Sequence, residues 1–183
     1  LFMVSINVLA QQQSDKFNEL YKLYDNKDYF RFINNTAKNI HDLNETEKNI
    51  LNAFIGSGAN KQESSSGLIN SILGNGQKLK DSLMLELYET LLQNAFVTYD
   101  YPTGLICAQK IMSDYKTLLD SNDVEEYDNI IDILTSAKDV GKQTAEIKAD
   151  TRIEVKRDMA GLSNIPVKIN GMDEEFIFDT GAN

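Results

Sequence analysis

The sequence predicts a mostly α-helical protein whose last part changes to β structure. Residues 14–140 place apolar side chains three and four positions apart, which is the pattern of helices that bury one face. After about Gly141 the pattern changes to short runs in which apolar and polar residues alternate, as is typical of strands. The length of 183 residues and the hydrophobic content of 42% suit one globular domain, or one domain with a smaller second one.

The first ten residues, LFMVSINVLA, form an apolar run that ends abruptly at the polar run QQQSDK. Val8 and Ala10 have the spacing that suits signal peptidase, so residues 1–10 are expected to be the end of a signal peptide. A buried N-terminal strand or helical turn is the alternative. A signal peptide would make the protein secreted or periplasmic, and the apolar run is too short to span a membrane.

The predicted helical region covers residues 11–140. Asn44 is expected to be the N-cap of one of these helices, because Glu47 follows three positions later as in a capping box. In the first helix the apolar face is expected to contain Phe17, Leu20, Tyr21 and Tyr24. In the long helix DSLMLELYETLLQNAFVTY it is expected to contain Leu83, Leu87, Leu91 and Phe96.

An internal repeat is visible in this helical region. Residues 53–55 (AFI) and 95–97 (AFV) are 42 positions apart, and residues 67–69 and 104–106 (both GLI) are 37 positions apart. Such a period fits stacked helix pairs. The segment LYKLYDNKDYFRFI also resembles the start of a tetratricopeptide unit, although the sequence has no tryptophan. A helical-hairpin, tetratricopeptide-like region is therefore predicted, with an irregular helical bundle as the alternative.

A domain boundary is predicted at residues 141–150, which are expected to be a linker. In residues 151–183, TRIEVK and IPVKIN alternate apolar and polar residues, EFIFD has the pattern of a buried strand, and Asn170-Gly171 is a strong hairpin signal. A segment of this size is too small to form an independent sheet domain. It is therefore expected to be the beginning of a larger all-β domain.

Composition excludes several function classes. The net charge of -10 argues against binding to nucleic acid, which needs basic patches. With a single cysteine, Cys107, and a single histidine, His41, the sequence supports neither a disulfide nor a metal site. Cys107 is expected to be a small buried apolar residue and His41 a surface or helix-end residue. No cofactor is indicated.

Two further segments resemble ligand-binding loops but lack the required residues. GSGAN at residues 56–60 is not followed by Gly-Lys-Ser/Thr, so it is expected to be a flexible loop between helices. The acidic run from Asp120 has Glu125 and Ile131 where a calcium loop needs glycine and glutamate. It is expected to be a turn followed by the solvated first turn of a helix.

The chemistry of the chain is concentrated at its C-terminal end. The apolar run 176–178 leads directly into Asp179, Thr180, Gly181 and Ala182. Two carboxylates that share one proton can hydrolyse peptides at mildly acidic pH, because like charges at close range cannot both ionise. Such a site needs each aspartate at the end of a core strand, a glycine for the tight turn and a small residue where two loops approach.

The segment IPVKINGMDEEFIFDTGAN resembles the N-terminal part of a retropepsin-like aspartic protease, in which a hairpin precedes a hydrophobic-hydrophobic-Asp-Thr-Gly-Ala loop. The resemblance implies that Asp179 is the catalytic aspartate. It implies that Thr180 braces the paired loop across the dimer axis, that Gly181 helps to hold water and substrate, and that Ala182 completes the active-site loop. The whole layout is similar to secreted proteins of Bacteroidetes that join a helical region to a retropepsin domain.

The implied function is that of an aspartic endopeptidase acting on a peptide or protein substrate. The resemblance implies that a second aspartate comes from a homodimer partner or from a missing C-terminal part. The 183-residue chain is expected to be an incomplete fragment that is inactive by itself. The alternative is a helical-repeat protein-binding module without catalytic activity, whose β segment is a terminal hairpin.

Overall fold

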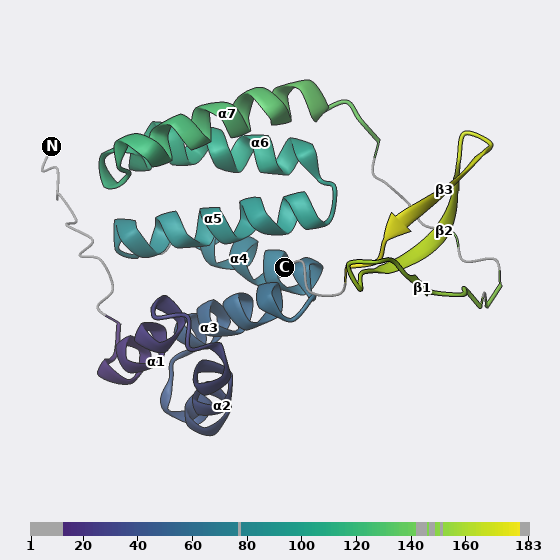
Figure 1. Ribbon diagram of the computed structural model, residues 1–183. Coiled ribbons are helices and arrows are strands. Elements are labelled where there is room, and N and C mark those ends of the chain that lie inside the picture. Colours follow the sequence, from purple (N-terminus) through teal and green to yellow (C-terminus); the bar gives the residue numbers. More distant parts are fainter. Residues whose placement is uncertain (1–12, 77, 142–145, 147–148, 151, 180–183) are drawn as a thin grey trace, which may run out of the picture. The chain divides into compact units, whose positions relative to one another are not determined.

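The computed structural model describes residues 13–76, 78–141, 146, 149–150 and 152–179. The chain divides into two compact units, Leu1–Gln143 and Thr144–Asn183, of which the first is helical and the second contains a small sheet (Figure 1). The expectation of a mostly helical protein with β structure at its C-terminal end is confirmed. The predicted signal peptide, residues 1–10, lies outside the described residues.

The described part of the first unit contains seven α-helices. They are α1 (Asp15–Asp25), α2 (Tyr29–Asn39), α3 (Glu45–Gly58), α4 (Gln62–Gly74), α5 (Asp81–Val97), α6 (Tyr101–Lys110) and α7 (Ser121–Ala137). A 3-10 turn at Ile40–Asp42 follows α2, and a π-helical turn at Ile111–Tyr115 and a 3-10 turn at Lys116–Leu118 follow α6. Helices α1 and α2, α3 and α4, and α5 and α6 pack as neighbours, and α6 also packs on α7 (Figure 1).

The apolar stripes predicted from the sequence form the core of this unit. Leu83, Leu87 and Leu91 of α5 are buried, while Phe96 is half-buried and packs against the same core. In α1, Phe17 and Leu20 are buried and the tyrosines of the stripe pack against the core. Each fully buried side chain of this size stabilises the fold by about 1.5–3 kcal/mol, so the stripes are the main force that assembles the helices.

The predicted capping box at the start of α3 is also confirmed. The side chain of Asn44 accepts a hydrogen bond from the backbone of Glu47 at 3.0 Å, and the carboxylate of Glu47 accepts one from the backbone of Asn44 at 3.1 Å. The carboxylate also accepts a hydrogen bond from the backbone N–H of Ser14 at 2.6 Å. Since Ser14 is the N-cap of α1, one buried carboxylate holds the N-terminal ends of two helices.

The same backbone turn joins three successive pairs of helices. One residue in each turn has a positive φ, and these residues are Lys27 (59°), Asn60 (56°) and Tyr99 (57°). The next N–H in each turn donates to a carbonyl five residues earlier, and these bonds are Asp28 to Leu23 (2.9 Å), Lys61 to Gly56 (2.8 Å) and Asp100 to Ala95 (2.8 Å). The donor residue is then the N-cap of the following helix in every case. The same turn geometry therefore recurs after α1, α3 and α5.

This turn corrects the register of the repeat that the sequence predicts. The equivalent carbonyls of the second and third turns belong to Gly56 and Ala95, which are 39 positions apart. Residues 53–55 and 95–97, which are 42 positions apart, are therefore displaced by about one helical turn relative to each other. The predicted register is wrong because backbone geometry repeats at these turns while the side chains do not.

The glycine- and serine-rich segment after residue 55 is also more ordered than its composition predicts. Residues 56–58 are the last turn of α3, and α4 begins at Gln62, so only three residues connect the helices. A Cβ placed on Gly56 would lie 3.4 Å from Cβ of Ser65, and the Ser65 hydroxyl donates to the Ala53 carbonyl at 2.8 Å. The small side chains therefore allow α3 and α4 to approach closely, and the prediction of a loop over residues 56–60 is wrong for residues 56–58.

Replacing Lys27 by glycine is expected to stabilise the protein by about 0.5–1 kcal/mol, because a residue with a side chain is strained at positive φ and glycine is not. Lys22→Gly is the matched control, since Lys22 is an exposed residue inside α1. That substitution is expected to destabilise the protein by about 1 kcal/mol. Urea unfolding of both variants checks the opposite signs, and a loss of stability in Lys27→Gly would contradict the strain argument.

Candidate active site

The described part of the second unit forms one antiparallel sheet with strand order β1-β2-β3. Its strands are β1 (Lys156–Arg157), β2 (Ser163–Ile169) and β3 (Met172–Ile177). The segment TRIEVK, expected to be a strand, contributes only Lys156 to β1. Strand β1 pairs with only the first two residues of β2, and the preceding residues Ile153 and Val155 lie outside this pairing and are half-exposed.

A turn centred on Asp158 joins β1 to β2. The Asp158 carboxylate accepts hydrogen bonds from the backbone N–H groups of Ala160 and Leu162, each at 2.9 Å. These bonds, that of Leu162 foremost, lower the pKa of the Asp158 carboxyl below its usual range. The charged form of Asp158 therefore stabilises the turn.

The hairpin between β2 and β3 has the turn that the sequence predicts. Asn170 has φ of 52° and Gly171 has φ of 85°, and both values are positive as a two-residue type I′ turn requires. The turn aligns Ile169 with Met172 and Ile165 with Phe176. The prediction of a hairpin at Asn170-Gly171 is confirmed.

This hairpin positions the predicted catalytic aspartate. The backbone N–H of Phe178 donates to the carbonyl of Ser163 at 2.7 Å, so strand pairing continues one residue beyond β3. Asp179 is the next residue, and it is exposed. The other three predicted active-site residues lie outside the described residues; they are Thr180, Gly181 and Ala182. The structure therefore describes the strand that leads to the site, and Asp179, but not the loop.

One face of the hairpin is apolar. Because side chains alternate along a strand and the register is fixed by the turn, this face is formed by Ile165, Val167, Ile169, Met172, Phe176 and Phe178, with the polar residues Ser163 and Glu174 among them. Phe176 and Phe178 are 49% and 52% exposed. The expectation that EFIFD is a buried strand is therefore wrong for this unit, whose described residues form only three strands and contain no second layer to cover the face.

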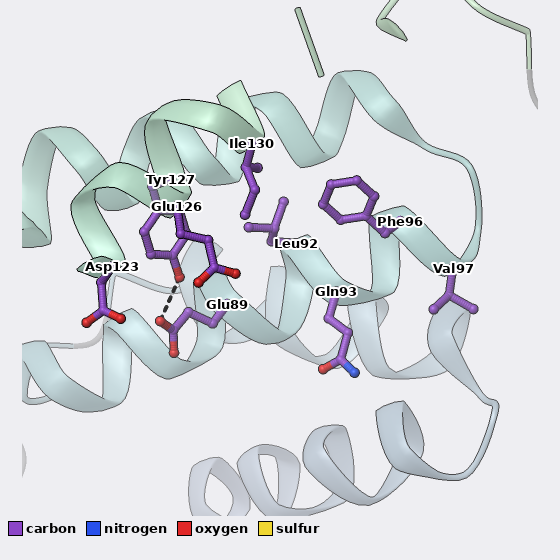
Figure 2. A pocket seen from close by; sticks show the side chains of 9 residues that line it. All are labelled: Glu89, Leu92, Gln93, Phe96, Val97, Asp123, Glu126, Tyr127 and Ile130. Atoms are coloured by element: carbon purple, nitrogen blue, oxygen red, sulfur yellow. Dashed lines mark hydrogen bonds between the residues drawn. The ribbon is translucent and has the colours of Figure 1, made fainter. Parts of the chain in front are cut away.

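A groove in the first unit is the other candidate site. It lies between α5 and α7, and its volume is about 470 Å³ (Figure 2). We define the α5–α7 groove by its lining residues, which are Glu89, Leu92, Gln93, Phe96, Val97, Asp123, Glu126, Tyr127 and Ile130. Its lining combines apolar side chains with three carboxylates, which is a composition that can bind part of a protein or a small ligand.

A tyrosine–glutamate pair links the two helices at this groove. The Tyr127 hydroxyl donates to Oε1 of Glu89 at 2.7 Å (Figure 2). Burial raises the pKa of the Glu89 carboxyl, the hydrogen bond from Tyr127 opposes that shift, and the charge of Asp123 adds to it. Burial, together with the bond to Glu89, raises the pKa of the Tyr127 hydroxyl. The second pair, Tyr24 with Glu86 at 2.9 Å, links α1 to α5 in the same way.

The raised pKa of Glu89 predicts a pH effect on stability. Because the folded-state pKa is above the ordinary value of 4.5, the folded protein binds more protons than the unfolded chain just above that pH. Ionisation of the Glu89 carboxyl therefore lowers the free energy of unfolding as pH rises above 4.5. Glu89→Gln keeps an acceptor for Tyr127 and removes the charge, so the variant is expected to gain stability relative to wild type at pH 7 and to lose this advantage below 4.5. Urea unfolding at both pH values checks it, and an equal difference at both would contradict it.

The charge distribution around the groove is one-sided. Helix α5 contains three acidic residues and α7 contains five, and neither helix contains lysine or arginine. The sequence analysis interpreted only the acidic run from Asp120, as a solvated first helical turn, and it did not predict the groove. The absence of lysine and arginine from both helices is a signal in the sequence that could have indicated an acidic site. The hydrophobic periodicity of the helices does not predict that α5 and α7 lie on the two sides of one groove.

The cysteine and the histidine have the environments expected of them. Cys107 is buried in α6, and burial raises the pKa of its thiol to about 11, so the thiol is protonated at neutral pH and is a poor nucleophile. His41 is exposed in the 3-10 turn after α2. Among the described residues, no group of three or more His, Cys, Asp or Glu side chains could hold a metal ion.

The acidic run beginning at Asp120 is the start of a helix. Asp120 is the N-cap of α7 and accepts hydrogen bonds from the N–H groups of Asn122 and Asp123 at 2.7 and 2.9 Å. The expectation of a turn followed by a first helical turn is confirmed.

Across the described ranges, no helix has the length and apolar character needed to cross a membrane.

Comparison of the chain with protein-family models, with curated proteins and with solved structures found no match. The function is therefore argued from the two sites themselves.

Proposed function

We propose that the full-length protein is an aspartic endopeptidase and that Asp179 is its catalytic carboxylate. The observation that carries the proposal is the β2–β3 hairpin, whose backbone pairing continues to Phe178 and stops one residue before Asp179. A residue that directly follows a paired strand has a well-defined backbone, which a catalytic group needs. The sequence Thr180-Gly181-Ala182 that follows resembles the active-site loop of the retropepsin-like proteases.

The proposed chemistry requires two aspartates. An ionised carboxylate takes a proton from water, and the water oxygen attacks the carbonyl carbon of the peptide bond. The protonated partner carboxyl gives its proton to the carbonyl oxygen. The C–N bond then breaks as the first carboxyl gives the nitrogen the proton it took from water, while the partner recovers a proton from a hydroxyl group of the intermediate. We assign the second carboxylate to Asp179 of a second copy of the chain, since a two-fold axis brings identical groups together.

The apolar face of the hairpin supports this assignment. Phe176 and Phe178 expose about half of their side chains in the described unit. In stable β domains such a face is buried by a second layer of protein. Further strands of a protease domain and a second copy of the chain would supply that layer.

The proposal is tested by incubating the full-length protein with an unstructured fluorogenic peptide between pH 4 and 7. We expect cleavage with an optimum at mildly acidic pH, because one carboxyl of the pair has to be protonated and the other ionised. Pepstatin is expected to inhibit it. Cleavage that is insensitive to pepstatin, or no cleavage over the whole range, would contradict the proposal.

The α5–α7 groove favours a second candidate function, that of a protein-binding module. The first unit is proposed to be a tetratricopeptide-like array, and the support is the turn repeated at Lys27, Asn60 and Tyr99. Stacked helix pairs form extended binding surfaces. If the protein binds a partner but Asp179 contributes to no cleavage, this second function is the main one.

A further inference from the structure

We infer that the α5–α7 groove docks an extended segment of another protein in which apolar residues are combined with lysine or arginine. The inference rests on the second candidate function, that of a protein-binding module, and does not depend on the proposed protease site. It rests on the shape of the groove, on its apolar floor and on the charges of the two helices that form it.

The floor of the groove is apolar and partly open. Leu92 is buried beneath it, Phe96 and Ile130 are half-buried along it, and Val97 is 52% exposed at the end of α5 (Figure 2). A volume of about 470 Å³ is within the range of sites that hold a ligand of several side chains. Burial of the exposed apolar side chains by leucine-sized groups would supply most of the affinity.

The carboxylates gather at one end of this floor, around Tyr127 (Figure 2). Asp123 and Glu126 extend from α7, and Glu89 extends from α5 on the opposite side (Figure 2). Only Oε1 of Glu89 accepts the hydrogen bond from Tyr127, so the carboxylate retains the capacity to accept another from a cation. None of the described residues that line the groove is lysine or arginine. An ammonium or guanidinium group at this end of the groove would therefore meet carboxylates and no competing cation from the groove itself.

These charges distinguish among the possible occupants. The carboxylates of the groove would repel nucleic acid and would also repel the acidic α5 and α7 helices of a second copy of the chain. A metal ion has no set of three ligands among the described side chains. A basic and apolar protein segment complements both the floor and the carboxylates, so it is the occupant that the groove fits best.

The inference is tested by fluorescence anisotropy with the 183-residue chain at 150 mM salt, where contacts between distant charges are screened. The probe is a labelled peptide of repeating Gly-Leu-Lys units. Two matched peptides replace lysine by glutamate or leucine by serine. We expect the Gly-Leu-Lys peptide to bind and both matched peptides to bind at least about tenfold more weakly, because each lacks one of the two complementary features.

Two pairs of variants localise the binding. Glu126 lines the groove, whereas Glu125 is next to it in α7 but does not line the groove. Glu126→Lys and Glu125→Lys change the net charge by the same amount, so they differ only in position. Val97→Ser changes the floor, while Ile133→Ser changes an exposed apolar residue of α7 outside the groove. We expect Glu126→Lys and Val97→Ser to weaken binding about tenfold or more, and the two controls to weaken it less than about twofold.

Several results would overturn the inference. Equal losses in Glu126→Lys and Glu125→Lys would mean that the net charge alone attracts the probe. Absence of binding, or equal binding of the glutamate peptide, would mean that the groove does not recognise basic segments. A chain that sediments as a dimer and becomes monomeric in Val97→Ser would mean that the groove is occupied by a second copy.

Discussion

Replacing Asp179 by asparagine is expected to reduce peptide cleavage by the full-length protein by about 10²- to 10⁴-fold or more. Asparagine has nearly the shape of aspartate but cannot take a proton from water, so the pair would lose the group that activates the nucleophile. Because Asp179 is exposed, the substitution is expected to change the free energy of unfolding by less than about 1 kcal/mol. The measurement is the rate of hydrolysis of a fluorogenic peptide near pH 5, with the melting temperature of each protein recorded beside it.

The matched control for this prediction is Asp173→Asn. Asp173 is on the polar face of the same strand, where its carboxylate lies 3.3 Å from Nζ of Lys168. An exposed pair of this kind contributes little, so the control is expected to keep its activity within about twofold. Equal activity of wild type and Asp179→Asn would reject the assignment of Asp179, and equal losses in both variants would show that the hairpin, rather than the carboxylate, is sensitive to substitution.

Replacing Glu47 by alanine is expected to lower the free energy of unfolding by about 2–4 kcal/mol. Glu47 is only 2% exposed, and its carboxylate accepts hydrogen bonds from the backbone of both Ser14 and Asn44. Alanine would leave the first N–H groups of α1 and α3 without this acceptor. Glu47→Gln is expected to lose most of the same stability, because its side-chain amide has only one oxygen and places an N–H₂ group against the second backbone donor.

Glu45→Ala serves as the control for Glu47. Glu45 is in the first turn of the same helix, but its side chain is 83% exposed and forms only an i,i+3 ion pair with Lys48. Its loss is expected to cost less than about 1 kcal/mol. Urea unfolding followed by circular dichroism gives all three values, and equal costs for Glu45→Ala and Glu47→Ala would contradict the role of Glu47 at two helix ends.

The helices could be predicted because their signals are local. The stripe of Leu83, Leu87 and Leu91 recurs at the helical period, and the capping box of Asn44 and Glu47 needs only four consecutive residues. The contact of Glu47 with Ser14 joins residues that are 33 positions apart, so no local pattern indicates it. The second role of Glu47 therefore became visible only in the folded chain.

The repeated turns show why the register of the repeat could not be predicted. The residues at positive φ are a lysine, an asparagine and a tyrosine, whereas the familiar sequence signal at such a position is glycine. The shared feature is the hydrogen bond from the residue after each of them to the carbonyl five positions earlier, which any residue other than proline can form. Backbone geometry repeats here without a repeated sequence.

The candidate protease site was partly predictable for a similar reason. The Asn170-Gly171 turn is a local signal and fixes the hairpin that leads to Asp179. Phe176 and Phe178 would be buried only if a second layer of protein covered their face of the hairpin. The strand pattern predicts burial but does not indicate which residues form that layer. The α5–α7 groove likewise depends on which helices become neighbours, and its one-sided charge acquires meaning only after α5 and α7 are placed together.

A subunit-mixing experiment tests the proposed half-site most directly. Wild-type and Asp179→Asn full-length proteins are refolded together at constant total concentration, and peptide hydrolysis is measured against the fraction of wild type. If each active site needs Asp179 from two copies, activity falls as the square of that fraction and reaches about one quarter in an equal mixture. Activity that falls in direct proportion, to about one half, would contradict a site shared between two copies.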